Sequence, residues 1–279
     1  MKYGVTIFPT DYGISVTDLG RAVEERGFES LFFPEHTHIP ASRKSPWPGG
    51  PDLPTEYWHT LDPFVALGAV AAVTTTLKLG TGICLVVEHD AINLAKHVAT
   101  LDHVSGGRVL FGIGAGWNLE EMANHGTDPA HRWGVVRERI AAMRQIWTQD
   151  AAEFHGKFEN FDPIWQWPKP VQKPHPPILI GGDSPGTFKR LLDYGDEWMP
   201  IAGRGGDLAP RIAELQRQAT ARGRGPIPIS AFGVRPDPAE IEKLEAAGVT
   251  RCMFGLPAAG ADRVMPLLDR YAGLIMSHA

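Results

Sequence analysis

Short apolar, β-rich runs alternate with longer helix-patterned runs along the whole sequence, and this alternation constrains the fold more than any other feature. The runs that predict strands are 3–8, 30–33, 77–87, 109–113, 178–180, 197–200, 227–234 and 251–254. Helical patterns follow at 16–26, 63–74, 92–104, 132–149, 187–194 and 208–222, with further helices beginning near Pro238 and Asp262. Such alternation requires parallel strands joined by crossover helices. Eight units favour an α/β fold of the (β/α)8 TIM-barrel type over an open sheet.

Two segments are too long for plain connections of such a barrel, the loop 35–62 and the insertion 150–177. Long loops in compact domains usually cover a site or form an interface. Both are rich in proline and aromatic residues, which include Trp47, Tyr57, Trp58, Trp165 and Trp167. These aromatic side chains either wall an apolar pocket or pack the loops onto the barrel, and the sequence does not separate the two. Since nothing resembles a linker, we expect a single domain over residues 1–279.

Charge and cysteine content exclude several classes of protein. The net charge is −5 and no dense Lys/Arg run occurs, which argues against a nucleic-acid or acidic-lipid partner. The two cysteines, Cys84 and Cys252, lie inside apolar runs, as core thiols of a reducing cytosol do. No run of about 18 apolar residues is present, and the first residues enter a strand directly. We therefore expect a soluble, cytoplasmic protein.

Glycines gather at the predicted strand ends, where the active site of a barrel lies. The run Gly181-Gly182-Asp183-Ser184 precedes a helical pattern at Thr187 and fits either a phosphate cradle or a tight turn. The run 112–117 places glycines at every second position and resembles part of a dinucleotide fingerprint. It lacks the full spacing, so it does not indicate a Rossmann fold.

One predicted strand end carries an acid–imidazole pair, Glu35-His36. A histidine at this position is a candidate acid or base near neutral pH, or a structural residue bonded to the loop. His36 and His38 also have the spacing of a barrel metal site. The later strand ends offer no convincing further ligand apart from Asp183, so we expect no metal.

Several motifs occur in order over residues 1–202 and together are specific. They are the runs 79–83, 94–109, 112–117, 170–182 and 195–200. In this set the sequence resembles the luciferase-like monooxygenase superfamily, and within it the F420-dependent oxidoreductase branch. The resemblance implies a TIM barrel with the cofactor ring over the strand C-terminal ends, and a homodimer.

The resemblance also implies site residues. In this family a bulge with a non-prolyl cis peptide on the third strand supports the cofactor ring, and the matching positions are Gly82 and Ile83. His36 and Glu35 match the catalytic pair. The implied cofactor-binding residues are Gly82, Ile83, Cys84, Gly114, Ala115, Gly116, Trp117, Gly181, Gly182, Asp183 and Ser184.

Two departures from the family pattern matter. Trp117 stands where the sugar-phosphate dehydrogenases of the branch carry a carboxylate, so sugar-phosphate oxidation is not expected. The turn after the third strand lacks the usual proline around Asp90-Ala91. The sequence thus favours an enzyme that transfers a hydride between coenzyme F420 and a small organic substrate. Two alternatives stay open: an FMN-dependent two-component monooxygenase that uses reduced flavin, and a non-catalytic ligand-binding barrel.

Overall fold

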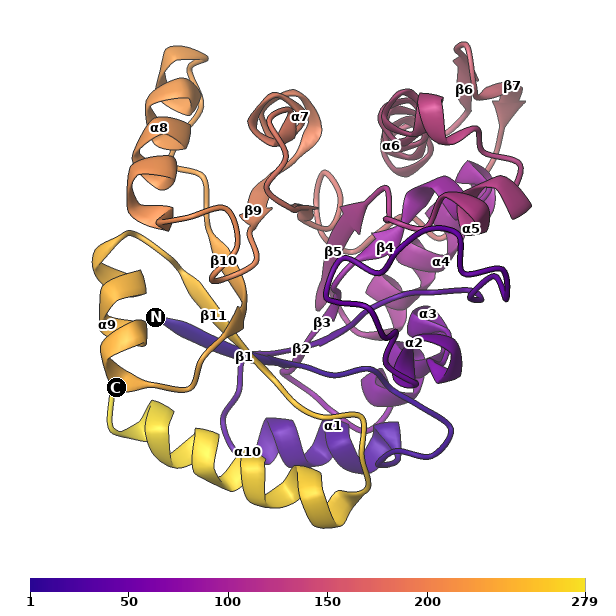
Figure 1. The fold of residues 1–279 in the computed structure, drawn as a ribbon. Coiled ribbons are helices and arrows are strands. Elements are labelled where there is room, and N and C mark those ends of the chain that lie inside the picture. The colour runs from indigo at the N-terminus through magenta and orange to yellow at the C-terminus, as the bar shows by residue number, and fades with distance from the viewer. Residues whose placement is uncertain (279) are drawn as a thin grey trace.

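Parallel strands form one sheet that curls into a nearly closed barrel in the computed structural model, which describes residues 1–278 (Figure 1). The neighbours run in the order β10-β11-β1-β2-β3-β5-β8-β9. Between β9 and β10 only isolated parallel bridges form, Trp198 to Ile229 and Ile201 to Phe232. The strands are β1 Lys2–Thr6, β2 Ser30–Phe33, β3 Lys78–Thr81, β4 Cys84–Leu85, β5 Val109–Gly114, β8 Ile178–Gly181, β9 Glu197–Met199, β10 Ser230–Val234 and β11 Arg251–Gly255. The predicted eight-unit barrel is confirmed.

Helices surround the sheet. The long ones are α1 Val16–Glu25, α3 Pro63–Ala71, α4 Ala91–Val104, α6 Arg132–Thr148, α7 Thr187–Tyr194, α8 Leu208–Ala221, α9 Pro238–Ala246 and α10 Ala261–Met276. Shorter turns are α2 Glu56–His59, α5 Leu119–Asn124, η1 Val86–Glu88 and η2 Pro129–His131. Ser15 and Asp62 cap α1 and α3 by accepting backbone N–H groups, because a side-chain oxygen replaces the missing intrahelical acceptor. No helix within residues 1–278 is long and apolar enough to span a membrane.

Two sequence-based boundaries were wrong. The third predicted strand, 77–87, is interrupted: β3 ends at Thr81, β4 resumes at Cys84, and η1 occupies its last part. The run is apolar throughout because both faces are buried, and an apolar run does not reveal a break. No strand was predicted in the insertion 150–177, yet it contains the antiparallel hairpin β6 Ala152–His155 and β7 Asn160–Ile164. The strands of this hairpin are too short to produce a visible alternation.

The barrel interior is filled by side chains that come only from strands. Phe32, Leu110, Leu179, Met199 and Met253 form a buried cluster separate from the core between sheet and helices. Ile83 and Phe232 pack on this cluster and are partly exposed. The interior of the barrel is therefore filled by side chains, and the end at which Ile83 and Phe232 lie is apolar.

The N-terminal strand ends are joined by buried charges. Arg251 at the start of β11 donates to both oxygens of Glu29 at 2.9 Å and to Glu197 of β9 at 2.6 Å. Its guanidinium has several acceptors, as a buried charge requires. In barrels the N-terminal ends of the strands usually contribute to stability, whereas the active site lies at their C-terminal ends.

Candidate active site

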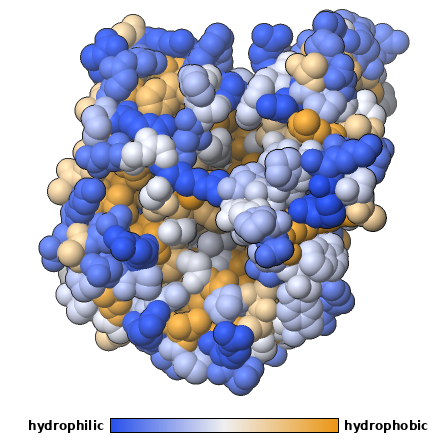
Figure 2. All heavy atoms as spheres, in the orientation of Figure 1, coloured by the Kyte–Doolittle hydropathy of each residue, from blue (hydrophilic) through white to orange (hydrophobic). Residues whose placement is uncertain are grey.

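A cavity of about 320 Å³ lies over the C-terminal ends of the strands. Its lining residues are Pro48, Gly82, Ile83, Gly114, Ala115, Gly116, Trp117, Trp133, Gly181, Gly182, Asp183, Ser184, Met199, Ile201, Arg204 and Phe232. A second chamber of about 240 Å³ shares the wall formed by Ile83, Trp117 and Phe232. Figure 2 shows hydrophobic residues deep in the hollow and hydrophilic residues around its rim. The site is an apolar recess with a polar margin.

Ile83 is held at this recess by its neighbours. The Gly82–Ile83 peptide bond is cis, as the family resemblance implied. A Cβ on Gly114 would lie 2.1 Å from Ile83 Cδ1, and one on Gly181 would lie 2.8 Å from Ile83 Cγ2. Glycines 114 and 181 therefore make room for a side chain of the protein itself. Gly182, in contrast, has a φ of +95° and open space at its Cβ position. Its backbone N–H donates to Met199 O at 3.2 Å, and its carbonyl accepts from Trp198 Nε1 at 3.0 Å.

The predicted cofactor residues are brought together with one exception. Gly82, Ile83, Gly114, Ala115, Gly116, Trp117, Gly181, Gly182, Asp183 and Ser184 all line the larger cavity. Cys84 lies outside this lining and is fully buried, because the side chain after Ile83 points to the other side of the strand. Glu35 and His36 line the second chamber.

Sequence reasoning missed other lining residues. These are Pro48, Leu85, Trp133, Ile201, Arg204 and Phe232. Phe232 lies in a strand and was within reach of strand-end reasoning, whereas Pro48 and Arg204 come from loops without a pattern. Of the five loop aromatics, Trp47 and Tyr57 line the second chamber. Trp165 and Trp167 are 86% and 58% exposed.

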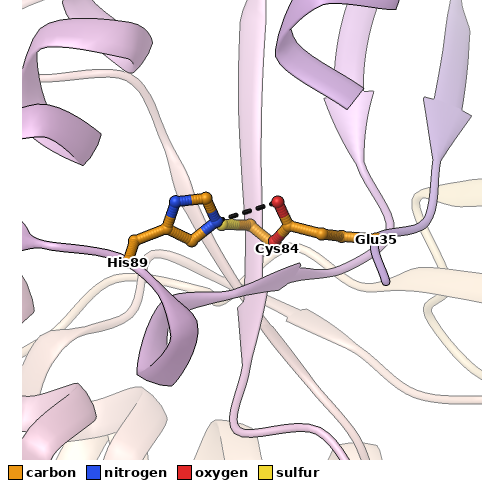
Figure 3. Close-up of side chains that lie close together, drawn as sticks. All are labelled: Glu35, Cys84 and His89. Carbon is orange, nitrogen blue, oxygen red and sulfur yellow. Dashed lines mark hydrogen bonds and ion pairs between the residues drawn. The ribbon is translucent and has the colours of Figure 1, made fainter. Parts of the chain in front are cut away.

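Glu35, Cys84 and His89 form a buried cluster (Figure 3). Glu35 accepts the Leu85 N–H at 2.6 Å and faces His89 Nε2 at 2.8 Å. Burial opposes ionisation of both partners, but their mutual hydrogen bond and charge prevail: the pKa of Glu35 is lowered and the pKa of His89 is raised. Burial and Glu35 raise the pKa of the Cys84 thiol.

The cluster fits an ion pair better than a metal site. Two ligands of a tetrahedral zinc ion lie about 3.3 Å apart, whereas the Glu35 oxygen and the His89 nitrogen are 2.8 Å apart. Their contact joins the loop after β2 to the segment that follows β4. The pair therefore anchors the backbone beside Ile83.

His36 is held by a carboxylate that sequence reasoning did not identify. Its Nδ1 lies 2.8 Å from Glu121 Oε2, and the two side chains are 5% and 1% exposed. Glu121 also accepts the Thr37 N–H at 3.1 Å. Asn118 caps α5 by accepting the Glu121 N–H at 3.2 Å. His36 Nε2 has no hydrogen-bond partner within residues 1–278, which leaves it available to a ligand in the chamber.

The opposite end of the larger cavity carries positive charge. Helix α7 begins at Thr187 without a side-chain cap and has no acidic residue in its first turn. Lys189 and Arg190 lie there instead; Lys189 pairs with Asp193, whereas Arg190 stacks over the Trp133 ring at 3.6 Å. Arg190 also donates to the Ser184 hydroxyl. A cation near the N-terminus of a helix is electrostatically unfavourable, because this end of the helix dipole is also positive, and a bound anion removes the repulsion. This end of the cavity therefore favours an anionic ligand group.

An α/β barrel with a recess at the C-terminal ends of its strands is the architecture of enzymes that bind their ligands at this face. The sequence model of the luciferase-like monooxygenase family matches residues 11–251. The chain belongs to this family, which the ordered motifs of the sequence had indicated.

Three known proteins illustrate the relationship. An uncharacterized protein of Mycobacterium tuberculosis is 42% identical over 277 residues, which cover 98% of each chain. The monooxygenase RslO1 from Streptomyces bottropensis has the same fold, with a TM-score of 0.84, 20% identity and coverage of 100% and 99%. An F420-dependent secondary alcohol dehydrogenase, in complex with an F420-acetone adduct, has a TM-score of 0.77, 19% identity and full coverage of both chains.

Proposed function

We propose that this protein is an oxidoreductase that transfers a hydride between coenzyme F420 and a small organic substrate. The observation that carries the proposal is the placement of His36. It faces a small apolar chamber that adjoins the larger, glycine-lined cavity across the wall of Ile83 and Trp117. A planar cofactor in the larger cavity and a substrate in the chamber would meet at this wall.

The residues present fit such a cofactor. Ile83 and Ala115 offer an apolar surface to a ring system, and Trp117 offers an aromatic one. The first turn of α7 and Arg190 suit a phosphate group. When bound, the deazaflavin supplies a hydride donor or acceptor. His36 would hold or take the substrate proton at Nε2, while the Glu35–His89 pair keeps the backbone beside Ile83 in place.

A reduced-FMN monooxygenase is the second candidate, because FMN also has a planar ring and a phosphate. The positive charge at α7 favours F420, whose tail carries carboxylates beyond the phosphate. Arg190 and the uncapped N-terminus of α7 supply this positive charge, whereas Lys189 is paired with Asp193.

The first experiment is a parallel titration of the purified protein with F420 and FMN, each oxidised and reduced, followed by tryptophan fluorescence. Trp117 and Trp133 line the cavity, so occupancy should quench them. We expect F420 to bind at least about tenfold more tightly than FMN, a difference of about 1.4 kcal/mol. Tighter binding of reduced FMN would instead assign the protein to the monooxygenases, and binding of neither would reject both.

Arg190→Gln tests the anionic end of the cavity. A hydrogen bond to a charged group contributes about 1.5–3 kcal/mol, so the variant should bind F420 roughly 10- to 100-fold more weakly. The deazaflavin core without phosphate and tail should bind both proteins equally. Arg217→Gln is the matched control, since Arg217 pairs only with Glu214 on the surface of α8. If Arg190→Gln weakened binding of the deazaflavin core as much as binding of F420, Arg190 would shape the cavity without contacting an anion.

A further inference from the structure

Arg204 lies where the two cavities of the site meet. Its side chain contributes to the lining of both the larger cavity and the second chamber. Among the residues within 1–278 that line either cavity, it is the only lysine or arginine. The other residues common to both linings are glycine, proline, aliphatic or aromatic residues. A ligand in either cavity therefore meets the guanidinium on an otherwise uncharged wall.

The carboxylates of these linings do not neutralise Arg204. Asp183 pairs with Arg211 at 2.8 Å, and Glu35 lies 2.8 Å from His89 Nε2. Within residues 1–278, no carboxylate oxygen lies within 4.0 Å of the Arg204 guanidinium. Its hydrogen bond is to a neutral group, the backbone oxygen of Pro48, at 3.4 Å. A guanidinium has five N–H donors, so most of them are available to a ligand, together with an unpaired positive charge.

The loop after β9 fixes the place of Arg204. The backbone turns there, because the Arg204 N–H donates to Ile201 O at 3.1 Å. The next residue, Gly205, has a φ of +72°, and a Cβ on it would lie 2.5 Å from Arg211 Nη1 and 3.4 Å from Asp183 Cβ. The loop backbone therefore packs directly against the Asp183–Arg211 ion pair. The position of Arg204 beside the recess follows from this packing.

The second chamber provides an apolar surface next to the charge. Phe8, Trp47, Tyr57 and Phe232 all line this space of about 240 Å³, which suits a small apolar or aromatic body. A guanidinium binds a carboxylate through two parallel N–H···O bonds. A phosphate monoester carries roughly −1.5 to −2 charges, more than one cation neutralises. The single charge therefore favours a carboxylate.

We propose that Arg204 is a specificity-determining residue that binds a carboxylate of the substrate, so that the substrate class is small apolar or aromatic carboxylic acids. The inference rests on the proposed function and deepens it, because it names the chemistry that the second chamber accepts. The carboxylate would lie at Arg204. The apolar body would then lie in the second chamber, which His36 also lines.

The binding of matched acids and amides tests this proposal without turnover. Benzoate and benzamide have similar size and shape but differ in charge, and hexanoate and hexanamide form an aliphatic pair. Hydrogen bonds to charged groups contribute about 10- to 100-fold to affinity. Arg204 is exposed to solvent, which screens part of this effect. In calorimetric titrations at low salt and neutral pH, we expect the purified protein to bind each acid about tenfold more tightly than its amide, and added salt should reduce the preference.

Substitutions of Arg204 assign the preference to this residue. Arg204→Gln should abolish it, whereas Arg204→Lys should retain only part of it, because an ammonium keeps the charge but loses the planar fork. Arg263→Gln is the matched control, since Arg263 is exposed in α10 and lines neither cavity. Phenyl phosphate should bind the wild type less tightly than benzoate does. Tighter binding of phenyl phosphate would overturn the assignment of a carboxylate.

Chemical labelling gives a second readout on the wild-type protein. Phenylglyoxal modifies arginine side chains, and mass spectrometry of peptides locates the modified residues. Benzoate should slow the modification of Arg204 several-fold, benzamide should not, and neither should affect Arg263. Equal affinity for acids and amides, binding of none of the probes, or an acid preference that survives in Arg204→Gln would overturn the proposal.

Cofactor titrations separate this inference from the proposed function. The F420 dissociation constant of Arg204→Gln should remain within about threefold of the wild-type value, because the cofactor phosphate is assigned to Arg190 and the first turn of α7. A loss of F420 affinity of about tenfold or more, with an unchanged preference for acids, would assign Arg204 to the cofactor and overturn the inference. If the wild type binds no F420 but prefers acids through Arg204, only the proposed function is rejected.

Discussion

His36→Ala is expected to lower turnover about a thousandfold while the F420 dissociation constant changes less than about threefold. General acid–base groups contribute roughly 10²- to 10⁴-fold to rate. His36 lines the second chamber, and its Nδ1 lies 2.8 Å from Glu121 Oε2. The larger cavity does not include His36 in its lining, so its removal should spare cofactor binding. Stopped-flow measurement of F420 reduction, with binding measured separately by fluorescence, tests both parts.

His131→Ala serves as the matched control. His131 is half exposed at the start of α6, where it pairs with Asp128, and its substitution should leave both constants unchanged. Turnover of His36→Ala equal to that of the wild type would remove the residue from the mechanism. A parallel loss of cofactor affinity would show instead that His36 supports the cavity wall.

The barrel architecture could be predicted because one local sequence pattern, an apolar strand followed by a helix, recurs along the chain. Each βα unit brings its own apolar strand and its own helix start, and the caps Ser15 and Asp62 were recognisable as single residues. The motif around Arg108 was recognisable too, although its physical role was not. Arg108 donates to the carbonyls of Ala71, Thr74 and Leu77, which satisfies the end of α3. Part of the family pattern therefore maintains the barrel.

The site was predictable only where strand ends define it. Ten of the eleven residues that were predicted to bind a cofactor line the cavity, but the glycines among them were interpreted as space for a ligand. At Gly114 and Gly181 the space belongs to Ile83. The His36–Glu121 contact joins residues 85 positions apart, and no local pattern encodes such a pairing. An acid in the first turn of α5 after a capping asparagine was the available signal, and it indicated only a helix start.

Gly112→Ala is expected to destabilise the protein by about 3 kcal/mol and to weaken cofactor binding. An added Cβ would lie 2.0 Å from the backbone oxygen of Thr81 and 2.9 Å from Met199 Cε. Overpacking costs about 1–3 kcal/mol when side chains can adjust, and here a backbone carbonyl has to move. Thr81 is also fixed by its own hydroxyl, which donates to Gly112 O at 2.7 Å. Because Thr81 precedes Gly82 and Ile83, the displacement should reach the cavity.

Gly68→Ala is the control for this substitution, since its Cβ would meet nothing within 4 Å in helix α3. Alanine in a helix interior should stabilise by about 0.5–1 kcal/mol relative to glycine. Chemical denaturation of the two variants should therefore give shifts of opposite sign, and F420 titration should show weaker binding for Gly112→Ala alone. A Gly112→Ala protein as stable as the wild type, with full cofactor affinity, would show that Thr81 and the segment after it move freely. In that case Gly112 would not hold the wall of Gly82 and Ile83 in place, and the support of that wall would rest on the Glu35–His89 pair.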